Sequence, residues 1–283
     1  MGGSRPVKKP EKEIKQAVKE HYGKAISRKG CCCGPPPEEI ADRVEDYLAL
    51  ASGYTPDELS VLPSGVTSFG CGNPVALMSV KEGDVVLDLG SGAGLDLILA
   101  SKKVGDRGRV IGLDMTPEMV EACRKNLEKT GVANAEVRQG EMEDMPVGDG
   151  EVDWIISNCV INLSPDKEKV FAEAYRVLKP GGQMMISDIV SYNLPEDVRE
   201  SVSAWVGCIA GAVEETDYLK MMREAGFDDV KIVEKRTYSC ADLGDHSESE
   251  CGCSCREGME DDVPVKSYAD KVASVKVYAR KPL

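Results

Sequence analysis

Short apolar runs alternate with longer amphipathic stretches through the middle of the chain. The apolar runs predict buried strands at residues 85–89, 109–113, 135–138, 152–157 and 183–189. The stretches between them predict helices at residues 95–103, 117–129 and 166–178, the last stopped by Pro180 and two glycines. Strands that alternate with helices of about 10 to 14 residues are typical of parallel βαβ units. The sequence therefore predicts an α/β fold with a doubly wound, Rossmann-like sheet.

The segments on either side predict a helical arm before the sheet and a smaller region after it. Residues 11–27 and 40–50 have helical periodicity, and the Gly- and Pro-rich loop between them presents Cys31, Cys32 and Cys33. After the sheet, residues 195–212 and 216–225 predict helices, and residues 230–235 and 274–280 predict strands. We predict three regions: an N-terminal helical arm with its cysteine loop at 1–72, the Rossmann-like domain at 73–192, and a C-terminal region at 193–283.

Charge and composition exclude several classes of partner. The chain has 35 Lys and Arg against 49 Asp and Glu, a net charge of −14, which repels phosphodiesters and anionic lipid headgroups. We therefore expect no nucleic-acid partner. No apolar run is long enough to span a bilayer, so we also expect no membrane partner and a cytoplasmic location. We further expect a monomer. Eleven cysteines in such a chain favour binding of a soft ion or redox chemistry over a disulfide framework.

A glycine turn between the first strand and its helix predicts a nucleotide site. Gly90, Gly92 and Gly94 let the backbone approach a ligand closely, and Asp114 ends the second strand 20 residues past Gly94. An acidic side chain at that place accepts hydrogen bonds from ribose hydroxyls. The spacing differs from the G-x-G-x-x-G pattern of dinucleotide sites.

The cysteines divide by their surroundings. Cys123 shares an apolar helical stripe with Met119 and Leu127, which predicts a core residue. Cys159 follows the fourth strand, at the edge where open α/β sheets bind ligands. For Cys71, in a glycine-flanked loop, and Cys208, on the predicted helix 195–212, a buried inert thiol fits as well as a ligand.

The two histidines carry no predicted role. His21 is on the arm helix and His246 lies in the acidic stretch 242–262, and we expect both to face solvent. That stretch holds eight acidic residues and one basic residue, so it predicts a mobile excursion. For its cysteines, Cys251, Cys253 and Cys255, metalloid capture, zinc binding with Cys240 or His246, and an inert tail all stay open.

Several segments together resemble a known enzyme family. Residues 86–94 resemble the first motif of class I S-adenosylmethionine methyltransferases, and residues 112–116, 140–143 and 176–182 resemble later motifs of that superfamily in order. Residues 68–74, 112–116, 157–163 and 205–212 look like those of microbial arsenite methyltransferases, with similarity from about residue 19 to residue 235. The resemblance implies a Rossmann-like class I methyltransferase fold and a methyl transfer from S-adenosylmethionine to arsenite for detoxification.

The resemblance also implies roles for individual residues. Arsenic would be held by Cys71, Cys159 and Cys208, with a fourth functional thiol at Cys32 or Cys33. By the same resemblance, Asp114 holds the ribose, Met115 packs on the adenine and Glu141 faces the adenine amino group. The cofactor-binding residues implied are Asp88, Gly90, Ser91, Gly92, Gly94, Asp114, Met115, Glu141, Met142 and Asn158.

The chemistry expected of thiolate-bound arsenic agrees with this assignment. Soft thiolates select soft centres, and the lone pair of trivalent arsenic can attack a methyl group without a general base. The transfer oxidises arsenic by two electrons, which a thiol pair can return as a disulfide, to be reset by thioredoxin or glutathione. Two other functions stay open: a C- or O-methyltransferase of a quinone-like metabolite, and a non-catalytic metalloid-binding protein.

Overall fold

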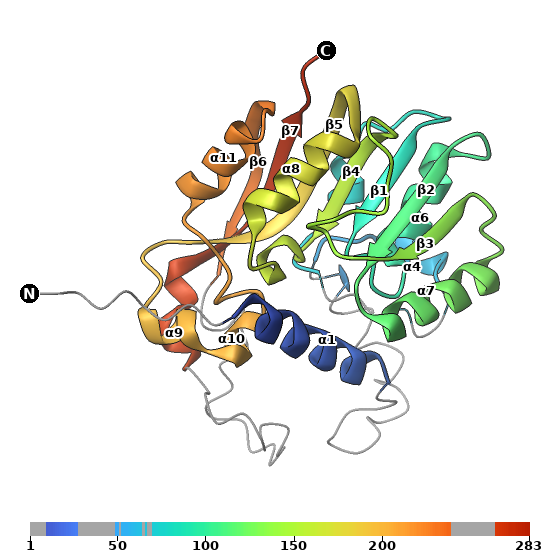
Figure 1. Cartoon of the computed structure of the whole chain (residues 1–283). Coiled ribbons are helices and arrows are strands. Elements are labelled where there is room, and N and C mark those ends of the chain that lie inside the picture. Colours follow the sequence, from blue (N-terminus) through green and yellow to red (C-terminus); the bar gives the residue numbers. More distant parts are fainter. Residues whose placement is uncertain (1–9, 28–48, 51, 64–65, 67–69, 239–263) are drawn as a thin grey trace, which may run out of the picture.

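Seven strands form one sheet in the order β3-β2-β1-β4-β5-β7-β6 (Figure 1). The computed structural model describes residues 10–27, 49–50, 52–63, 66, 70–238 and 264–283. The strands are β1 (Val85–Leu89), β2 (Arg109–Asp114), β3 (Ala135–Gln139), β4 (Val152–Asn158), β5 (Leu178–Ser191), β6 (Asp228–Thr237) and β7 (Val272–Arg280). β1 to β5 pair in parallel, whereas β7 lies antiparallel between β5 and β6. The predicted doubly wound α/β sheet is confirmed, and it continues past residue 192 through β6 and β7.

Helices cover both faces of this sheet. The α-helices are α1 (Glu11–Ser27), α4 (Pro56–Ser60), α5 (Pro74–Leu77), α6 (Leu95–Val104), α7 (Pro117–Thr130), α8 (Lys167–Val177), α9 (Glu196–Glu200), α10 (Val202–Val206) and α11 (Glu215–Glu224). Single 3-10 turns occupy η1 (Ile161–Leu163), η2 (Val265–Ser267) and η3 (Ala269–Lys271). None of the helices in the described ranges has the length and apolar character that a bilayer crossing requires.

Alternating side chains of the strands feed two core layers. Leu87 and Leu89 of β1 pack in the layer under α8 and α11, whereas Val86 packs in the layer under α5, α6 and α7. Because successive side chains of a strand point to opposite faces, an unbroken apolar run is what a sheet covered on both sides requires. The same alternation turns Asp88 toward the α6 side, close to the glycine turn.

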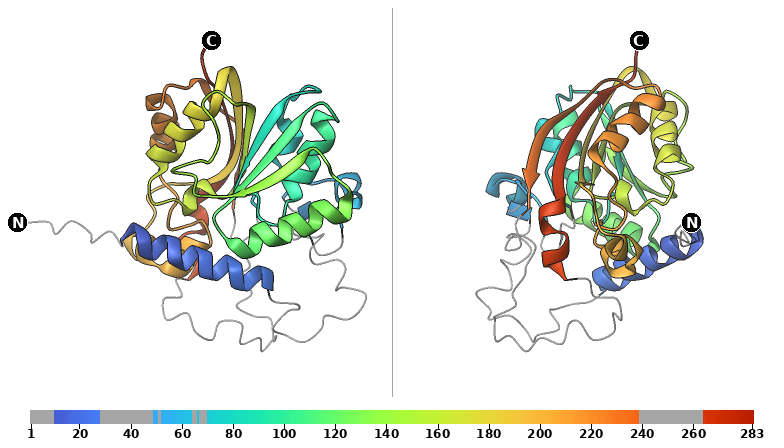
Figure 2. Two further views of the ribbon diagram at one scale, coloured as in Figure 1. Left: turned by 45° about the vertical axis from the view of Figure 1, so that its right-hand side comes forward. Right: turned by 90° about the vertical axis from the view of Figure 1, so that its left-hand side faces the viewer.

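Helix α1 crosses the end of the sheet where the parallel strands terminate. It packs against α7, α10 and η1, and both views of Figure 2 place it along that edge, below the strands. Its boundaries agree with the predicted arm helix 11–27. The arm therefore covers the edge at which ligands of such sheets bind.

The predicted helix 195–212 is wrong in its second half. Two short helices, α9 and α10, replace it, because Ser201 between them is extended. After α10 the amide N–H groups of Ile209 and Ala210 both donate to the Ala204 carbonyl, which closes a turn. Cys208 lies in this turn with φ of +63°, so it is not on a helix.

Strand β5 begins earlier than the pattern predicts. Val152 pairs with Leu178 while Trp154 pairs with Gln183, so residues 179–182 form an irregular insertion in the strand. Pro180, Gly181 and Gly182 are typical of a loop, so the sequence pattern predicts the start of the strand only at residue 183. The predicted helix 40–50 is described only at residues 49–50, and the acidic stretch 242–262 lies outside the described residues.

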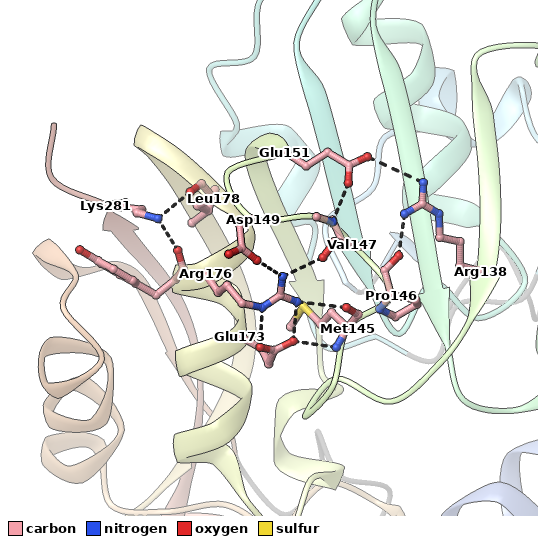
Figure 3. Close-up of polar contacts among 12 residues, drawn as sticks. Arg138, Met145, Pro146, Val147, Asp149, Glu151, Glu173, Arg176, Leu178 and Lys281 are labelled. Carbon is pink, nitrogen blue, oxygen red and sulfur yellow. Dashed lines mark hydrogen bonds and ion pairs between the residues drawn. The ribbon is translucent and has the colours of Figure 1, made fainter.

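A polar network fixes the connection between β3 and β4 against α8 (Figure 3). The Arg176 guanidinium donates to the carbonyls of Val147 (2.9 Å) and Met145 (3.1 Å), and it pairs with Asp149 and Glu173. The Met145 amide N–H donates in turn to Glu173 at 2.8 Å. This connection includes Glu141, which the resemblance assigns to the adenine. The network therefore holds the connection rigid near the end of β3.

Arg176→Ala should lower the free energy of unfolding by about 2 kcal/mol. It removes hydrogen bonds to two carbonyls, each of roughly 0.5 to 1.5 kcal/mol, and the side chain is only 32 % exposed. Urea denaturation measures the change. Arg107→Ala is the control, because the 76 % exposed Arg107 only pairs with Glu82 and should cost less than about 0.5 kcal/mol. An equal loss of unfolding free energy in the two variants would contradict a stabilising role for the Arg176 network.

Candidate active site

A pocket opens where β1, β2 and β4 end, and α1 covers it. We call it the strand-end pocket. It is lined by Lys15, Val18, Tyr22, Gly90, Gly92, Leu113, Asp114, Met115, Thr116, Met119, Gly140, Met142, Glu143, Asn158, Cys159, Val160, Leu163 and Ser164. Of the predicted cofactor residues, Gly90, Gly92, Asp114, Met115, Met142 and Asn158 line it. Asp88, Ser91, Gly94 and Glu141 are not among the lining residues.

Asp114 holds the glycine turn at the floor of this pocket. Its carboxylate accepts from the amide N–H of Gly92 at 3.0 Å and from that of Thr116 at 2.8 Å. Gly92 has a φ of +51°, and a Cβ placed on it would meet no atom within 4 Å. The turn thus presents bare backbone to open space, which is the form of a ligand cradle.

Three carboxyl groups gather behind the turn. Asp88 is 2 % exposed, and its Oδ2 has no hydrogen-bond partner within the described parts of the chain. Burial, followed by the charges of Asp96 and Asp114, raises the pKa of Asp88 well above its usual range. Burial also raises the pKa of Asp96 to about 6, against hydrogen bonds from Tyr54 and Asn158. Such a cluster favours a ligand that brings positive charge.

Ion pairs fasten α1 over the pocket. Lys15 Nζ lies 2.7 Å from Glu141 Oε2 and 3.0 Å from Glu143 Oε1. Further along the helix, the Tyr22 hydroxyl donates to the Val206 carbonyl at 3.1 Å. Glu141, expected to face the adenine, therefore uses its carboxylate on Lys15. Sequence reasoning missed Lys15 and Tyr22, although with Val18 they follow one face of the arm helix at spacings of three and four.

The three predicted thiol positions meet beside this pocket. Cys71 and Cys159 form a disulfide with Cα atoms 5.8 Å apart, although 88 residues separate them in sequence. The Cys208 thiol donates to the Cys159 carbonyl at 2.7 Å. All three pack in one apolar cluster with Val18 of α1. The structure therefore brings together Cys71, Cys159 and Cys208, and Cys159 also lines the pocket.

Two of these cysteines have a left-handed backbone. Cys159 has a φ of +59° and Cys208 one of +63°, and they are two of only four non-glycine residues with positive φ in the described ranges. This conformation costs a residue with a side chain about 1 to 3 kcal/mol and concentrates at functional sites. The sequence gives no signal for it, because neither position is a glycine.

Burial keeps the Cys208 sulfur protonated. It raises the pKa of this thiol to about 12, helped by the charge of Asp188 and opposed by Tyr22 and Lys167. At neutral pH, Cys208 is therefore a thiol. With Cys71 and Cys159 joined, the described residues contain no group of three His, Cys, Asp or Glu side chains arranged to hold a metal ion.

The remaining predicted positions fall into two groups. Cys123 is buried as predicted, and its Sγ lies 2.8 Å from where a Cβ on Gly94 would be, behind the glycine turn. His21 is half-buried rather than solvent-facing, with its ring edge-on to Tyr22. Outside the described residues lie Cys31, Cys32, Cys33, Cys240, Cys251, Cys253, Cys255 and His246.

Comparison with known proteins decides the family. A family model described as a methyltransferase domain matches residues 80–226. The crystal structure of an arsenic(III) S-adenosylmethionine methyltransferase from Chlamydomonas reinhardtii is similar, with 33% sequence identity, a TM-score of 0.62, and coverage of 88% of this chain and 75% of that one. The chain belongs to the arsenite S-adenosylmethionine methyltransferase family. The predicted resemblance is confirmed.

Two curated relatives extend this comparison. The arsenite methyltransferase of Halobacterium salinarum is 41% identical over 232 residues, which cover 79% of this chain and 59% of the relative. The arsenite methyltransferase of Aquipseudomonas alcaligenes is 34% identical over 240 residues, covering 80% and 66%. The chain thus spans about three fifths to two thirds of the length of these relatives.

The cofactor of this family is S-adenosylmethionine, and the strand-end pocket fits it. Asp88 Oδ2, buried and without a hydrogen-bond partner in the described part of the chain, lies on the strand that leads into the glycine turn, and Gly92 of the pocket lining leaves open space beside its backbone. Asp114 keeps lone pairs for ribose hydroxyls, and Met115 offers an apolar surface to a base. The carboxyl cluster suits the positive charge of a sulfonium and an ammonium group.

Asp114→Ala should weaken S-adenosylmethionine binding by about 10- to 100-fold. The change removes charge-assisted hydrogen bonds to the ribose, and it leaves the Gly92 amide N–H without its acceptor. Calorimetric titration measures the affinity. Asp106→Ala, an exposed change in the loop after α6, is the control. An unchanged affinity for Asp114→Ala would remove this residue from the site.

Affinity for S-adenosylmethionine should tighten as pH rises from 5 to 7. The pKa of Asp96 is about 6, so this carboxyl is mostly protonated at pH 5, and burial raises the pKa of Asp88 in the same direction. A cation binds best to ionised carboxyls, and Asp96 loses its proton as pH rises through 6. Calorimetry at several pH values tests this. Asp88→Asn should flatten the dependence, and an affinity that weakens with rising pH would contradict it.

Proposed function

We propose that this protein transfers the methyl group of S-adenosylmethionine to trivalent arsenic held by Cys71, Cys159 and Cys208. The observation that carries the proposal is the position of Cys159. It lines the strand-end pocket, is bonded to Cys71, and accepts the Cys208 thiol hydrogen bond on its own carbonyl. The thiols and the cofactor residues therefore share one site.

Sulfur ligation of arsenic proceeds from neutral groups. Each arsenic–sulfur bond forms as an arsenic-bound hydroxyl leaves with the thiol proton as water, so a thiol with a raised pKa can still exchange. The pKa of Cys208, raised to about 12 by burial, keeps a thiolate out of the apolar cluster until arsenic arrives. Soft sulfur ligands select a soft centre over hard cations.

No general base is required for the transfer. S-adenosylmethionine supplies an electrophilic methyl group, and three sulfur ligands leave the arsenic lone pair free as the nucleophile. No proton leaves arsenic, so the site needs alignment of the reactants more than acid–base groups. The composition of the pocket agrees, because its lining includes no histidine.

A disulfide step completes the cycle. Methyl transfer oxidises arsenic formally from the trivalent to the pentavalent state. Cys71 and Cys159 then leave arsenic as one disulfide, which returns the two electrons, while Cys208 keeps its arsenic–sulfur bond and a water molecule adds to arsenic as hydroxyl and releases one proton. The bond between Cys71 and Cys159 supports this choice of pair. A dithiol such as thioredoxin, or glutathione, then reduces it. This reductant, the cytoplasmic location and the monomeric state stay predictions.

Two other functions compete with this proposal. A C- or O-methyltransferase of a quinone-like metabolite would use the same cofactor residues, but it has no need of three cysteines at the methyl acceptor side. A metalloid-binding protein without turnover would use the thiols, but it has no need of Asp114 and the open glycine turn. The presence of both sets at one edge of the sheet, with Cys159 in the pocket lining, favours arsenic methylation.

Product analysis tests the proposal. Full-length protein incubated with arsenite, S-adenosylmethionine and a dithiol should yield methylated arsenicals, resolved by chromatography with arsenic detection, and one S-adenosylhomocysteine for each methyl group transferred. Cys159→Ser and Cys208→Ser should each lower the rate more than 100-fold with arsenite and with monomethylated arsenite. A hard, protonated hydroxyl is a poor ligand for a soft centre. Cys71→Ser should lose arsenite but keep monomethylated arsenite, which needs two sulfurs, with the added dithiol reducing the pentavalent product in place of the Cys71–Cys159 pair.

Cys123→Ser provides the matched control. Cys123 is buried like Cys208, but it packs in the layer under α5, α6 and α7 and not in the cluster of the three cysteines, so its variant should keep the methylation rate while losing about 1 to 3 kcal/mol of stability. If Cys159→Ser and Cys208→Ser methylate at the wild-type rate, arsenic binds elsewhere. If the wild type methylates a quinol but not arsenite, the alternative enzyme is correct.

A further inference from the structure

The Asn158 side chain makes its hydrogen bonds to the loop that carries Cys71. Asn158 is the last residue of β4, directly before Cys159. Its Oδ1 accepts from the amide N–H of Cys71 at 3.0 Å and from that of Gly72 at 3.2 Å. Its Nδ2 donates to the Gly72 carbonyl at 2.6 Å. One amide therefore ties both the N–H and C=O groups of the loop to the strand end.

Two buried side chains hold this amide in its orientation. The Tyr54 hydroxyl donates to Asp96 Oδ1 at 2.7 Å, so its oxygen is left to accept from Asn158 Nδ2 at 3.0 Å. Asp96 Oδ2 also accepts from Nδ2, at 3.2 Å. Because Asp96 and the Gly72 carbonyl are acceptors, the NH₂ group must face them and Oδ1 must face the loop amides.

The loop is shaped to come this close. A Cβ on Gly70 would lie 2.2 Å from Asn158 Nδ2, so only glycine permits the approach. Ser52 Oγ donates to the Gly70 carbonyl at 2.9 Å, and Ser274 Oγ donates to that of Cys71 at 3.3 Å. The backbone around Cys71 is therefore fixed from several elements, with Asn158 at the centre.

We propose that Asn158, held by Tyr54 and Asp96, is a positioning residue that sets the Cys71 sulfur against Cys159. It fixes how readily the two thiols pair with each other and how well they converge on one arsenic. The sequence resemblance assigns Asn158 to the cofactor, whereas its hydrogen bonds are directed to the Cys71 loop. The arsenic part of this proposal rests on the proposed function, but the pairing of the two thiols does not.

The thiol–disulfide equilibrium of this pair provides the test. Two glutathione molecules reduce the Cys71–Cys159 bond to two thiols and form one glutathione disulfide, so electrons and protons balance. Full-length protein is equilibrated in glutathione buffers, quenched with acid, and the Cys71–Cys159 peptide is quantified by mass spectrometry. This readout is specific to the pair and is independent of the other cysteines and of any methyl transfer.

Asn158→Asp is the main variant because it keeps the size of the side chain. It replaces the donor with a carboxylate oxygen that faces Asp96 and the Gly72 carbonyl, which are both acceptors. The equilibrium should shift at least tenfold toward the two thiols, and Tyr54→Phe should shift it about threefold in the same direction. Tyr218→Phe is the control, because Tyr218 is also buried and donates to a buried carboxyl, Asp188, at 3.0 Å, and it should change the equilibrium less than twofold.

Kinetics separate the two candidate roles of Asn158. A positioning role predicts a higher KM for arsenite and a smaller change for monomethylated arsenite. An unchanged equilibrium in folded Asn158→Asp overturns the proposal, as does a loss of cofactor affinity without a shift in the equilibrium. If Asn158→Asp does not fold, Tyr54→Phe decides by the same equilibrium. A wild type that does not methylate arsenite refutes the proposed function but leaves this equilibrium test intact.

Discussion

Parallel pairing of β1 with its two neighbours places the glycine turn, Asp114 and Cys159 side by side. Leu89, the last residue of β1, is paired with Leu113 of β2 and with Ser157 of β4. The next residues along the three strands are Gly90, Asp114 and Asn158, and Cys159 follows. Because parallel strands end at the same edge, this register brings the glycine turn, the ribose acceptor and the first thiol into one pocket.

The edge carries costs that the rest of the fold offsets. Carboxyl groups of Asp88 and Asp96 are buried, and Cys159 and Cys208 have a backbone conformation unfavourable for their side chains. Two apolar layers, one on each face of the sheet, supply the burial that stabilises the molecule in spite of them. The buried carboxyl groups favour a ligand with positive charge, and the cysteine sulfur atoms favour a soft centre.

The sequence predicts the sheet and much of the pocket, because both depend on local pattern. Apolar runs mark the strands, and residues directly after them must lie at the carboxyl edge, which places Asp114 and Cys159. Contacts between distant segments could not be predicted in this way. The turn at Cys208 forms where Gly211 packs against the Asn162 carbonyl, and Glu141 pairs with Lys15 of the arm. Contacts of this kind depend on the tertiary structure, so residue spacing along the chain does not predict them.

Arsenic X-ray absorption of the reduced protein with one equivalent of arsenite tests the central claim most directly. The claim is that Cys71, Cys159 and Cys208 together hold the methyl acceptor at the strand-end pocket. The account predicts coordination of arsenic by three sulfur atoms in the wild type and by fewer in Cys159→Ser. Arsenic bound mainly to oxygen in the wild type, or three sulfur ligands retained in Cys159→Ser, would contradict it.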